Sequence, residues 1–264
     1  MTSSLRTWFW TLLLAGIIGA ALPDPAFPQT YVRGGASLDW GDDTRFKDVD
    51  CSSTTPAALY GCGTGNDGAP LSSLGDFGTI AGLEFGLGYT IVPALRLEAA
   101  VQYRPDFSFD GRANFTQLSP GDRRDVTAEL SALSGMTAAY LDIGELLLFH
   151  YASIGPFIGI GGGLSRIEIG ETRMDFPETS TIVPGGDRVS FTWMLTAGLS
   201  ISLRPRLMLD VGWRYTDHGR IETAKGEGRV VRREDGHVLA AFDLAETKGH
   251  LRSHGLNVSL RYAF

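Results

Sequence analysis

Charged side chains alternate with apolar ones in several stretches of this 264-residue chain. In a β-strand, that spacing places the charges on one face and the apolar side chains on the other. If such strands close into a narrow barrel, opposite charges on the inner face can pair as a plug, or exchange partners to gate a small pore. The charged residues that we expect on the inner face are Glu84, Arg96, Glu98, Arg104, Glu129, Asp210, Arg214 and Arg261. We favour the plug, because a barrel of eight strands has only enough interior to be filled by side chains.

Serine, histidine and acidic residues near the C-terminus raise the question of catalysis. Ser253 and His254 precede the last predicted strand, but neighbours in a strand point to opposite faces and cannot readily share a hydrogen bond. Asp217 and His218 would form an isolated pair in a loop. Nothing in the sequence fixes these side chains as metal ligands either. We therefore predict no catalytic, metal-binding or cofactor-binding residues, and no cofactor.

Cys51 and Cys62 are the only cysteines of the chain. They lie in a segment rich in glycine, aspartate and serine, without the nearby histidines expected of a zinc site. In an exported protein, two such cysteines favour a disulfide, which would stabilise the short loop by about 2–3 kcal/mol. We therefore predict a disulfide between Cys51 and Cys62.

The N-terminus is typical of a secretory signal peptide. A basic residue, Arg6, precedes an apolar run from Trp8 to Ala20 that ends in small residues, so we expect cleavage after Ala21. An uncleaved membrane anchor is the alternative, but Pro23 interrupts the run before it reaches the roughly 20 residues that a spanning helix needs. Export then places the rest of the chain outside the cytoplasm.

Charge and hydropathy restrict the function classes further. The formal net charge of −7 argues against a nucleic-acid partner. After the signal peptide, no apolar run is long enough for a helix to cross a bilayer. If the mature chain spans a membrane, it must do so as a closed β-sheet, because only that structure satisfies every backbone group in lipid without helices.

The elements that would position the charged residues are strands with an apolar and a polar face. Such alternation over about ten residues, repeated along the chain behind an export signal, is typical of an outer-membrane β-barrel. The expected strands cover residues 31–40, 81–89, 95–104, 126–142, 154–165, 191–203, 207–216 and 255–264. Their even number and the short turns between some of them predict an antiparallel, up-and-down transmembrane barrel of eight strands.

Long polar connections alternate with the short turns and define the topology. We expect both termini and the short turns in the periplasm, and four long extracellular loops at about 41–76, 105–125, 166–189 and 217–250. The last loop contains a predicted hairpin over residues 230–244, and a ten-stranded barrel is the alternative. Aromatic residues expected in the girdles at the membrane surfaces are Trp40, Tyr89, Tyr103, Tyr140, Tyr215 and Tyr262.

One motif is more specific than the alternation. The run from Leu203 to Asp217 contains the pattern Asp-x-Gly-aromatic-Arg-Tyr-x-Asp, and it resembles the penultimate hairpin of small outer-membrane proteins of the opacity-protein and surface-antigen type, relatives of the OmpA membrane domain. The segments 156–163 and 260–264 are similar to other parts of that family. The resemblance spans most of the mature chain.

The resemblance implies an eight-stranded barrel that the outer-membrane assembly machinery inserts after recognising a terminal aromatic signal, here Tyr262 and Phe264. It implies no single activity, because the family includes adhesins, surface antigens and envelope-stabilising proteins. Its members contact outer-membrane lipid and lipopolysaccharide. Extracellular loops on a rigid scaffold are the expected place for an extracellular ligand.

The sequence therefore predicts three segments: a cleaved signal peptide (1–21), a short periplasmic segment (22–30) and an outer-membrane barrel domain (31–264). We expect a cell outer-membrane protein of Gram-negative type with a structural or surface-recognition role, adhesin-like or antigen-like and non-catalytic. A narrow gated channel for ions or small solutes is the first alternative. A lipid-modifying outer-membrane enzyme is the second.

Overall fold

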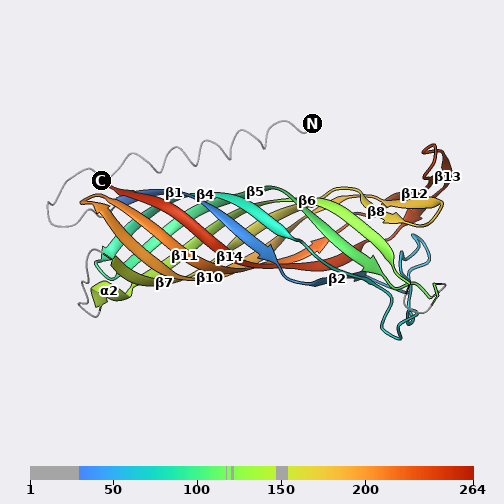
Figure 1. The fold of residues 1–264 in the computed structure, drawn as a ribbon, viewed down its shortest axis with the longest axis horizontal. Helices are drawn as coiled ribbons and strands as arrows, with labels where there is room; N and C mark the ends of the chain where they lie inside the picture. Colours follow the sequence, from blue (N-terminus) through green and yellow to red (C-terminus); the bar gives the residue numbers. More distant parts are fainter. Residues whose placement is uncertain (1–29, 117, 120–121, 147–153) are drawn as a thin grey trace.

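The computed structural model describes residues 30–116, 118–119, 122–146 and 154–264, which form one antiparallel sheet. Eight of its strands close into a ring because β14 pairs with β1 (Figure 1). In ring order they are β1 (Thr30–Gly41), β4 (Thr79–Val92), β5 (Leu95–Ala113), β6 (Arg124–Asp142), β7 (Ile154–Ile169), β10 (Gly186–Arg204), β11 (Leu207–Glu222) and β14 (Thr247–Ala263). The predicted eight-stranded, up-and-down barrel is thus confirmed. The predicted signal peptide lies outside the described residues.

Shorter elements accompany the ring. They are β2 (Thr44–Asp48), β3 (Ser73–Asp76), β8 (Thr172–Asp175), β9 (Thr179–Val183), β12 (Gly226–Arg232), β13 (Val238–Leu244) and the single helical turn α2 (Ile143–Leu146). The strands β12 and β13 form the predicted hairpin, and β12 also pairs with β9 outside the ring. The alternative of ten barrel strands is therefore wrong. In the described part of the chain, no helix is long and apolar enough to cross a membrane.

The periplasmic part of the wall carries apolar side chains outward and polar ones inward. On β14, Leu256, Val258 and Leu260 are about half exposed, whereas Asn257 and Ser259 are buried in the lumen. The outward apolar residues form the belt that faces lipid, because their exposure to water would be costly for a free surface of this size. Tight turns at residues 93–94 and 205–206 connect neighbouring strands at the periplasmic end, as predicted.

Glycines on the inner face make room for long side chains from neighbouring strands. A Cβ atom at Gly88 would lie 2.0 Å from Cζ of Tyr31, and one at Gly86 would lie 2.8 Å from Oε1 of Glu98. Both distances are shorter than van der Waals contact. Only glycine therefore fits at positions 86 and 88 of β4, where the side chains of Tyr31 and Glu98 enter the lumen.

Beyond the lipid-facing belt, the chemistry of the two faces is reversed while the alternation continues. On β6, Leu130 and Ala128 point inward and are buried, whereas Ser131 and Glu129 point outward. Much of the segments expected as long loops is consequently strand, for example β5 up to Ala113 and β6 from Arg124. The strands continue beyond the lipid-facing belt as a longer cylinder (Figure 1), whose interior there is apolar.

Two assignments from the sequence are wrong. Glu129 does not line the lumen, because the inner face of β6 is set by Val126 and Leu130 and includes only even-numbered residues. Tyr140 is on that same inner face, buried, rather than in an aromatic girdle; its ring packs edge-on against Phe157. The alanines and serines of this strand gave no clear signal for which face points inward.

Candidate functional site

The membrane-level lumen contains a network of ion pairs centred on Glu84. Arg33 donates to Glu84 through Nη1, and Arg214 donates to the same carboxylate through Nη2 at 2.6 Å. Arg33 also binds Glu98, with 2.6 Å between Nη2 and Oε1. These side chains come from β1, β4, β5 and β11 and are at most 4% exposed. Glu84 of β4 thus links the neighbouring strand β1 to β11, three strands away around the ring.

Three further pairs complete the network above and below Glu84. Arg104 binds Asp39 toward the extracellular side (2.8 Å), while Arg96 binds Asp142 (2.6 Å) and Arg261 binds Asp210 (3.0 Å) toward the periplasm. Each guanidinium contacts its carboxylate through two nitrogens. Five arginines therefore balance five carboxylates, a neutral set that can remain buried only while it stays paired.

The structure places seven of the eight predicted inner charges in this network and excludes Glu129. Sequence reasoning missed Arg33, Asp39 and Asp142. Counting every second residue from Tyr31 would have found Arg33 and Asp39, because both share its inward face on β1. Asp142 is the last residue of β6, where alternation gives no guidance.

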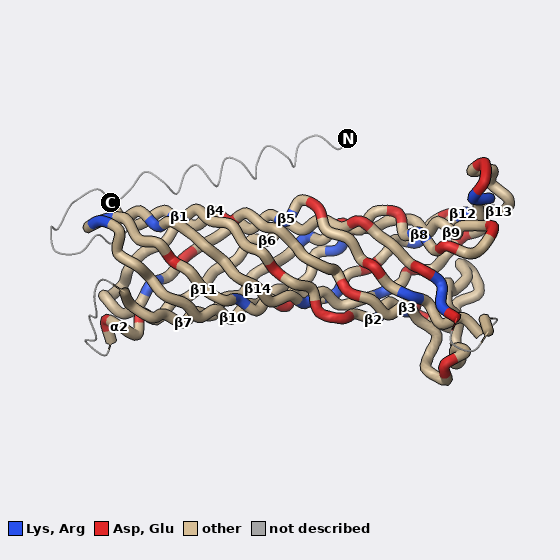
Figure 2. The backbone as a smooth tube through the Cα atoms, in the orientation of Figure 1, with Lys and Arg blue, Asp and Glu red and all other residues tan. Residues whose placement is uncertain are grey.

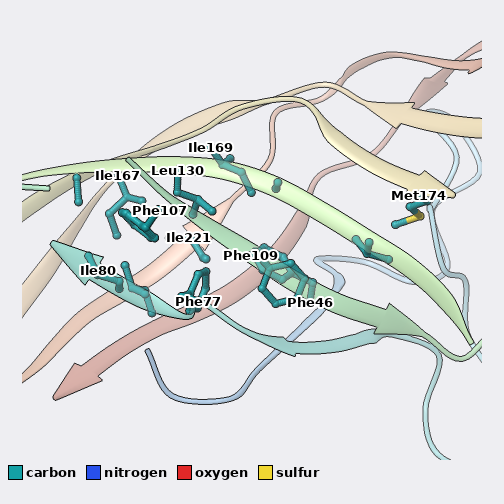
Figure 3. Close-up of a cluster of buried hydrophobic side chains, with 14 of the residues drawn as sticks. Phe46, Phe77, Ile80, Phe107, Phe109, Leu130, Ile167, Ile169, Met174 and Ile221 are labelled. Carbon is teal, nitrogen blue, oxygen red and sulfur yellow. The ribbon is translucent and has the colours of Figure 1, made fainter. Parts of the chain in front are cut away.

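An apolar cap fills the lumen above the charges. It includes Phe77, Ile80, Phe107, Ile167, Ile221 and Leu251, each at most 6% exposed (Figure 3). The ring of Phe77 lies 6.0 Å from Phe107 and 5.5 Å from Phe109, with tilted or edge-on geometry that favours aromatic pairs. In the described part of the chain, these apolar side chains pack together across the lumen above the charges.

Two cavities of the described residues, about 480 and 270 Å³ in volume, lie on the wall and at the periplasmic end. A cavity of about 270 Å³ opens at the periplasmic mouth between Arg96, Met208 and Arg261, whereas that within the charge network measures only about 10 Å³. The smaller volume corresponds to about one water molecule. The described lumen is therefore filled between its periplasmic mouth and its apolar cap.

A serine and a histidine do meet in the lumen, although not the adjacent pair. His254 points outward to Asp42, with Nδ1 at 3.2 Å from Oδ1, whereas Ser253 points inward, as the strand geometry predicted. Ser253 Oγ lies 3.4 Å from Nε2 of His218, which is fully buried and has no partner at Nδ1. Among the described residues, no group of His, Cys, Asp and Glu could hold a metal ion.

The first extracellular segment is folded onto the barrel. Cys51 and Cys62 form a disulfide with their Cα atoms 4.8 Å apart. The carboxylate of Asp48 accepts hydrogen bonds from the backbone N–H groups of Leu59, Tyr60 and Gly61. Farther along, Asp67 accepts from Asn114 and from Arg123, at 2.8 and 2.7 Å. The disulfide loop is thereby held at a fixed place at the extracellular end.

The hairpin β12–β13 projects from that end (Figure 1). β13 is the last strand in the sheet order, and its residues from Val238 to Asp243 are exposed on both faces. One element touches its outer edge: Ala57 of the disulfide loop donates its N–H to Asp243 and accepts from Ala245. An apolar strand with a largely free edge is therefore presented to the exterior.

Comparison with known families and structures gives consistent results. Residues 9–264 match the family described as outer membrane protein beta-barrel domain. No curated protein matches the chain.

Several solved structures are similar in fold. A Neisserial surface protein A is 15% identical, with 89% of this chain and 97% of that chain covered and a TM-score of 0.39. OprG from Pseudomonas aeruginosa is 12% identical, with 90% and 97% covered and a TM-score of 0.43. The outer membrane protease OmpT from Escherichia coli is 8% identical, with 92% and 99% covered and a TM-score of 0.37.

Proposed function

Because the chain belongs to the family of outer membrane protein β-barrel domains, we propose that it is a non-catalytic surface-recognition protein that acts through its extracellular end. The observation that carries this proposal is the exposed apolar edge of β13. Its occupant is an extended segment of another protein, which adds to the sheet as a further strand. Recognition by strand addition obtains affinity from main-chain hydrogen bonds and specificity from alternate side chains.

The hydrogen-bonding direction of β13 supports this role. Because Asp243 C=O and Ala245 N–H point to Ala57, the N–H and C=O groups of Ala241, two residues away, point to the same outer edge. The intervening Phe242 is paired with Gly228 of β12 instead. The two hydrogen bonds to Ala57 support pairing at this edge, and the backbone groups of Ala241 lie next to them.

The edge is also apolar on both faces. The bulge at Leu239 reverses the alternation, so Phe242 lies on one face and Val238 on the other. Val238, Leu239 and Phe242 are each between 38% and 46% exposed. An unprotected strand of this composition is normally a liability, because it pairs with other chains. Its position on the outermost hairpin makes that pairing useful for recognition.

The filled lumen favours recognition over the channel alternative. An ion crossing the barrel would have to separate the Glu84 network and then pass the apolar cap. The enzyme alternative is disfavoured by the position of the Ser253–His218 pair, which is buried in the lumen away from lipid and from the periplasmic cavity. Adhesin-like or antigen-like exposure follows from the placement of β13.

We further propose that residues 1–21 direct export and that residues 22–30 form a short periplasmic segment. Tyr262 and Phe264 would serve as the assembly signal; both are exposed on the outer face, with their rings 5.5 Å apart. Their exposed rings at the open end of the last strand support recognition by the assembly machinery.

A pair of substitutions at one position tests the recognition proposal. Ala241→Pro removes the free edge N–H, whereas Ala241→Val retains it with a side chain that suits a strand. Linear peptides displayed on phage would be selected against the refolded wild type in nanodiscs. We expect the selected peptides to bind the Val variant as well as wild type and to lose binding to the Pro variant.

Two outcomes would overturn the proposal. One is equal peptide binding to wild type and to Ala241→Pro, which would show that the edge is not used. The other is concentration-dependent self-association of wild type that Ala241→Pro abolishes, which would make a second copy the occupant instead. Heat-dependent gel migration checks that each variant has formed a barrel.

A further inference from the structure

The outward face of β14 changes from apolar to basic at the extracellular boundary of the lipid-facing belt. Reading upward from Leu256, every second residue is basic: His254, Arg252, His250 and Lys248. His254 lies in register with Trp40 of β1 and Tyr215 of β11, the aromatic residues at the membrane surface. The basic residues therefore begin at the level of the lipid headgroups.

The height of these residues follows from strand geometry. A rise of about 3.4 Å per residue and a tilt of about 40° move the chain roughly 2.6 Å outward per residue. Arg252 then lies about 5 Å and His250 about 10 Å above His254. The lower two residues coincide with the headgroup layer, which is about 5–7 Å thick on each side. The upper ones coincide with the sugars that a lipopolysaccharide carries above it.

Two neighbouring strands extend this surface, which we call the basic face: Lys47, Arg220, Lys248, His250, Arg252 and His254. Lys47 of β2 is directly opposite Lys248. Arg220 of β11, which lies 3.5 Å from the carboxylate of Glu222, is directly opposite His250. Like charges in register repel each other. In the described part of the chain, neither Lys47 nor Lys248 has an ion-pair partner, so these like charges are unneutralised.

Carboxylates hold the lower part of the basic face in place. Asp217 accepts from His250 Nε2 at 2.7 Å and from Arg252 Nε at 3.2 Å. Arg252 is engaged through Nε alone, and its side chain is 51% exposed. Its terminal nitrogens therefore remain available for an anion beside the barrel, in a geometry suited to phosphate.

The opposite wall has the reverse charge at the same height. Asp106, Glu129, Glu168 and Asp187 surround a single cation, Arg166, which lies 3.1 Å from Glu168 and 3.3 Å from Asp187. Charged residues are frequent in the extramembrane part of the cylinder (Figure 2). Their outward side chains are basic on β2 and β14, of both signs on β11, and mostly acidic on β5, β6, β7 and β10. A uniform coating of charges for solubility would not produce this separation.

We propose that the basic face binds the headgroup phosphates of lipopolysaccharide, and so orders anionic lipid along one side of the barrel. The proposal commits to a lipid occupant, because the basic row is continuous with the lipid-facing row of β14 and starts at headgroup height. It is independent of the recognition role of β13, which lies on another element.

The test compares a double variant with a matched control. Lys248→Gln/Arg252→Gln removes two cations from the basic face, and Arg166→Gln removes one from the acidic wall. Each protein would be refolded into phosphatidylcholine nanodiscs that contain a trace of diphosphoryl lipid A, or the same lipid without phosphates. Native mass spectrometry would count the lipid A molecules that remain bound.

We expect the double variant to retain diphosphoryl lipid A about thirtyfold more weakly, from about 1 kcal/mol per basic residue near a charged surface. Arg166→Gln should match wild type, and dephosphorylated lipid A should be lost from all three proteins. Equal retention by the double variant and wild type would overturn the proposal, as would equal retention of dephosphorylated lipid by wild type. Displacement of lipid A by millimolar inorganic phosphate alone would assign the site to free anions and also overturn it.

Discussion

At the residue scale, Glu84 is the point on which the buried charges converge. Its carboxylate accepts from both Arg33 and Arg214, and all three side chains are buried. Burying charges is unfavourable in itself, so the network contributes mainly by holding the strands in one arrangement once each charge is paired. A change at one member therefore leaves an unbalanced charge that the narrow lumen cannot hydrate.

We predict that Arg214→Ala lowers the free energy of unfolding by about 3–5 kcal/mol, because Glu84 loses one of its two partners inside the barrel. Urea unfolding in lipid vesicles would measure it. Arg214→Lys, which retains the charge, should lose less. Arg166→Ala, an exposed arginine in ion pairs, should cost no more than about 1 kcal/mol. Similar losses for Arg214→Ala and Arg166→Ala would contradict the assigned network.

Asp67 gives the extracellular segment a defined response to acid. Hydrogen bonds from the Asn114 side chain and from the Ala69 N–H, together with Arg123, hold the pKa of Asp67 at about 2. A lowered carboxyl pKa stabilises the folded state above the unfolded-state pKa and ceases to do so as the pH falls through the folded-state pKa. We predict an unchanged Ala69 amide resonance from neutral pH to about pH 4, and a shift as the pH approaches 2.

The control for that titration is Asp67→Asn, which should show no shift of the Ala69 resonance in the same range. A midpoint for wild type at the ordinary aspartate value of about 4 would instead mean that Asn114 and Arg123 do not bind Asp67 in solution.

At the element scale, the strands have constant faces but change environment along their length. On β6 and β14, alternate residues point outward from one end to the other, yet those residues are apolar beside lipid and charged beyond it. The sequence predicted the part in lipid because apolar residues on the outer face identify it. It could not predict the strand segments outside the membrane. Their polar outward residues resemble those of a loop, and their apolar inward residues are buried only by contacts with other strands.

The same limit explains the errors at Glu129 and Arg33. Residues such as Ala and Ser on β6 fit either face, so only contacts with β5 and β7 decide the orientation of Glu129. Arg33 lies beside two glycines on β1, which weaken the alternation there, although its inward face follows from counting every second residue from Tyr31. The hairpin β12–β13 was predictable, because two apolar runs flank a polar turn. Its exposure on both faces was not.

The apolar cap provides a test at this scale. Phe77→Ala removes a ring packed against Phe107 and Phe109, and we predict a loss of about 3–5 kcal/mol in unfolding free energy. The mutant barrel should still carry no current, because the charge network beneath the cap remains filled. An open pore in this variant would show that the cap alone seals the lumen.

The disulfide loop provides a second test at the element scale. Replacing both Cys51 and Cys62 with Ser should destabilise the loop by about 2–3 kcal/mol while the barrel keeps its thermal midpoint. Hydrogen exchange at the amides of Ala57 and Ala245, which join the loop to β13, would report the loss. Exchange as slow as in wild type would mean that Asp48 holds the loop without the disulfide.

At the scale of the whole molecule, the protein is an outer-membrane barrel. Paired charges occupy its interior at membrane level, and apolar side chains occupy it on the extracellular side of these charges. Its two outer walls differ in charge, and one apolar strand edge projects beyond them. Under the proposed function, the surface interacts with other molecules and the interior is structural. The proposed function therefore requires a lumen that does not conduct ions.

Single-channel recording of the refolded protein in planar bilayers tests that claim most directly, with heat-dependent gel migration to show that the barrel has formed. We predict no steady current from wild type or from Arg214→Ala, because the cap is intact in both. A steady conductance in wild type that Arg214→Ala alters would contradict the account and make transport the function of the lumen.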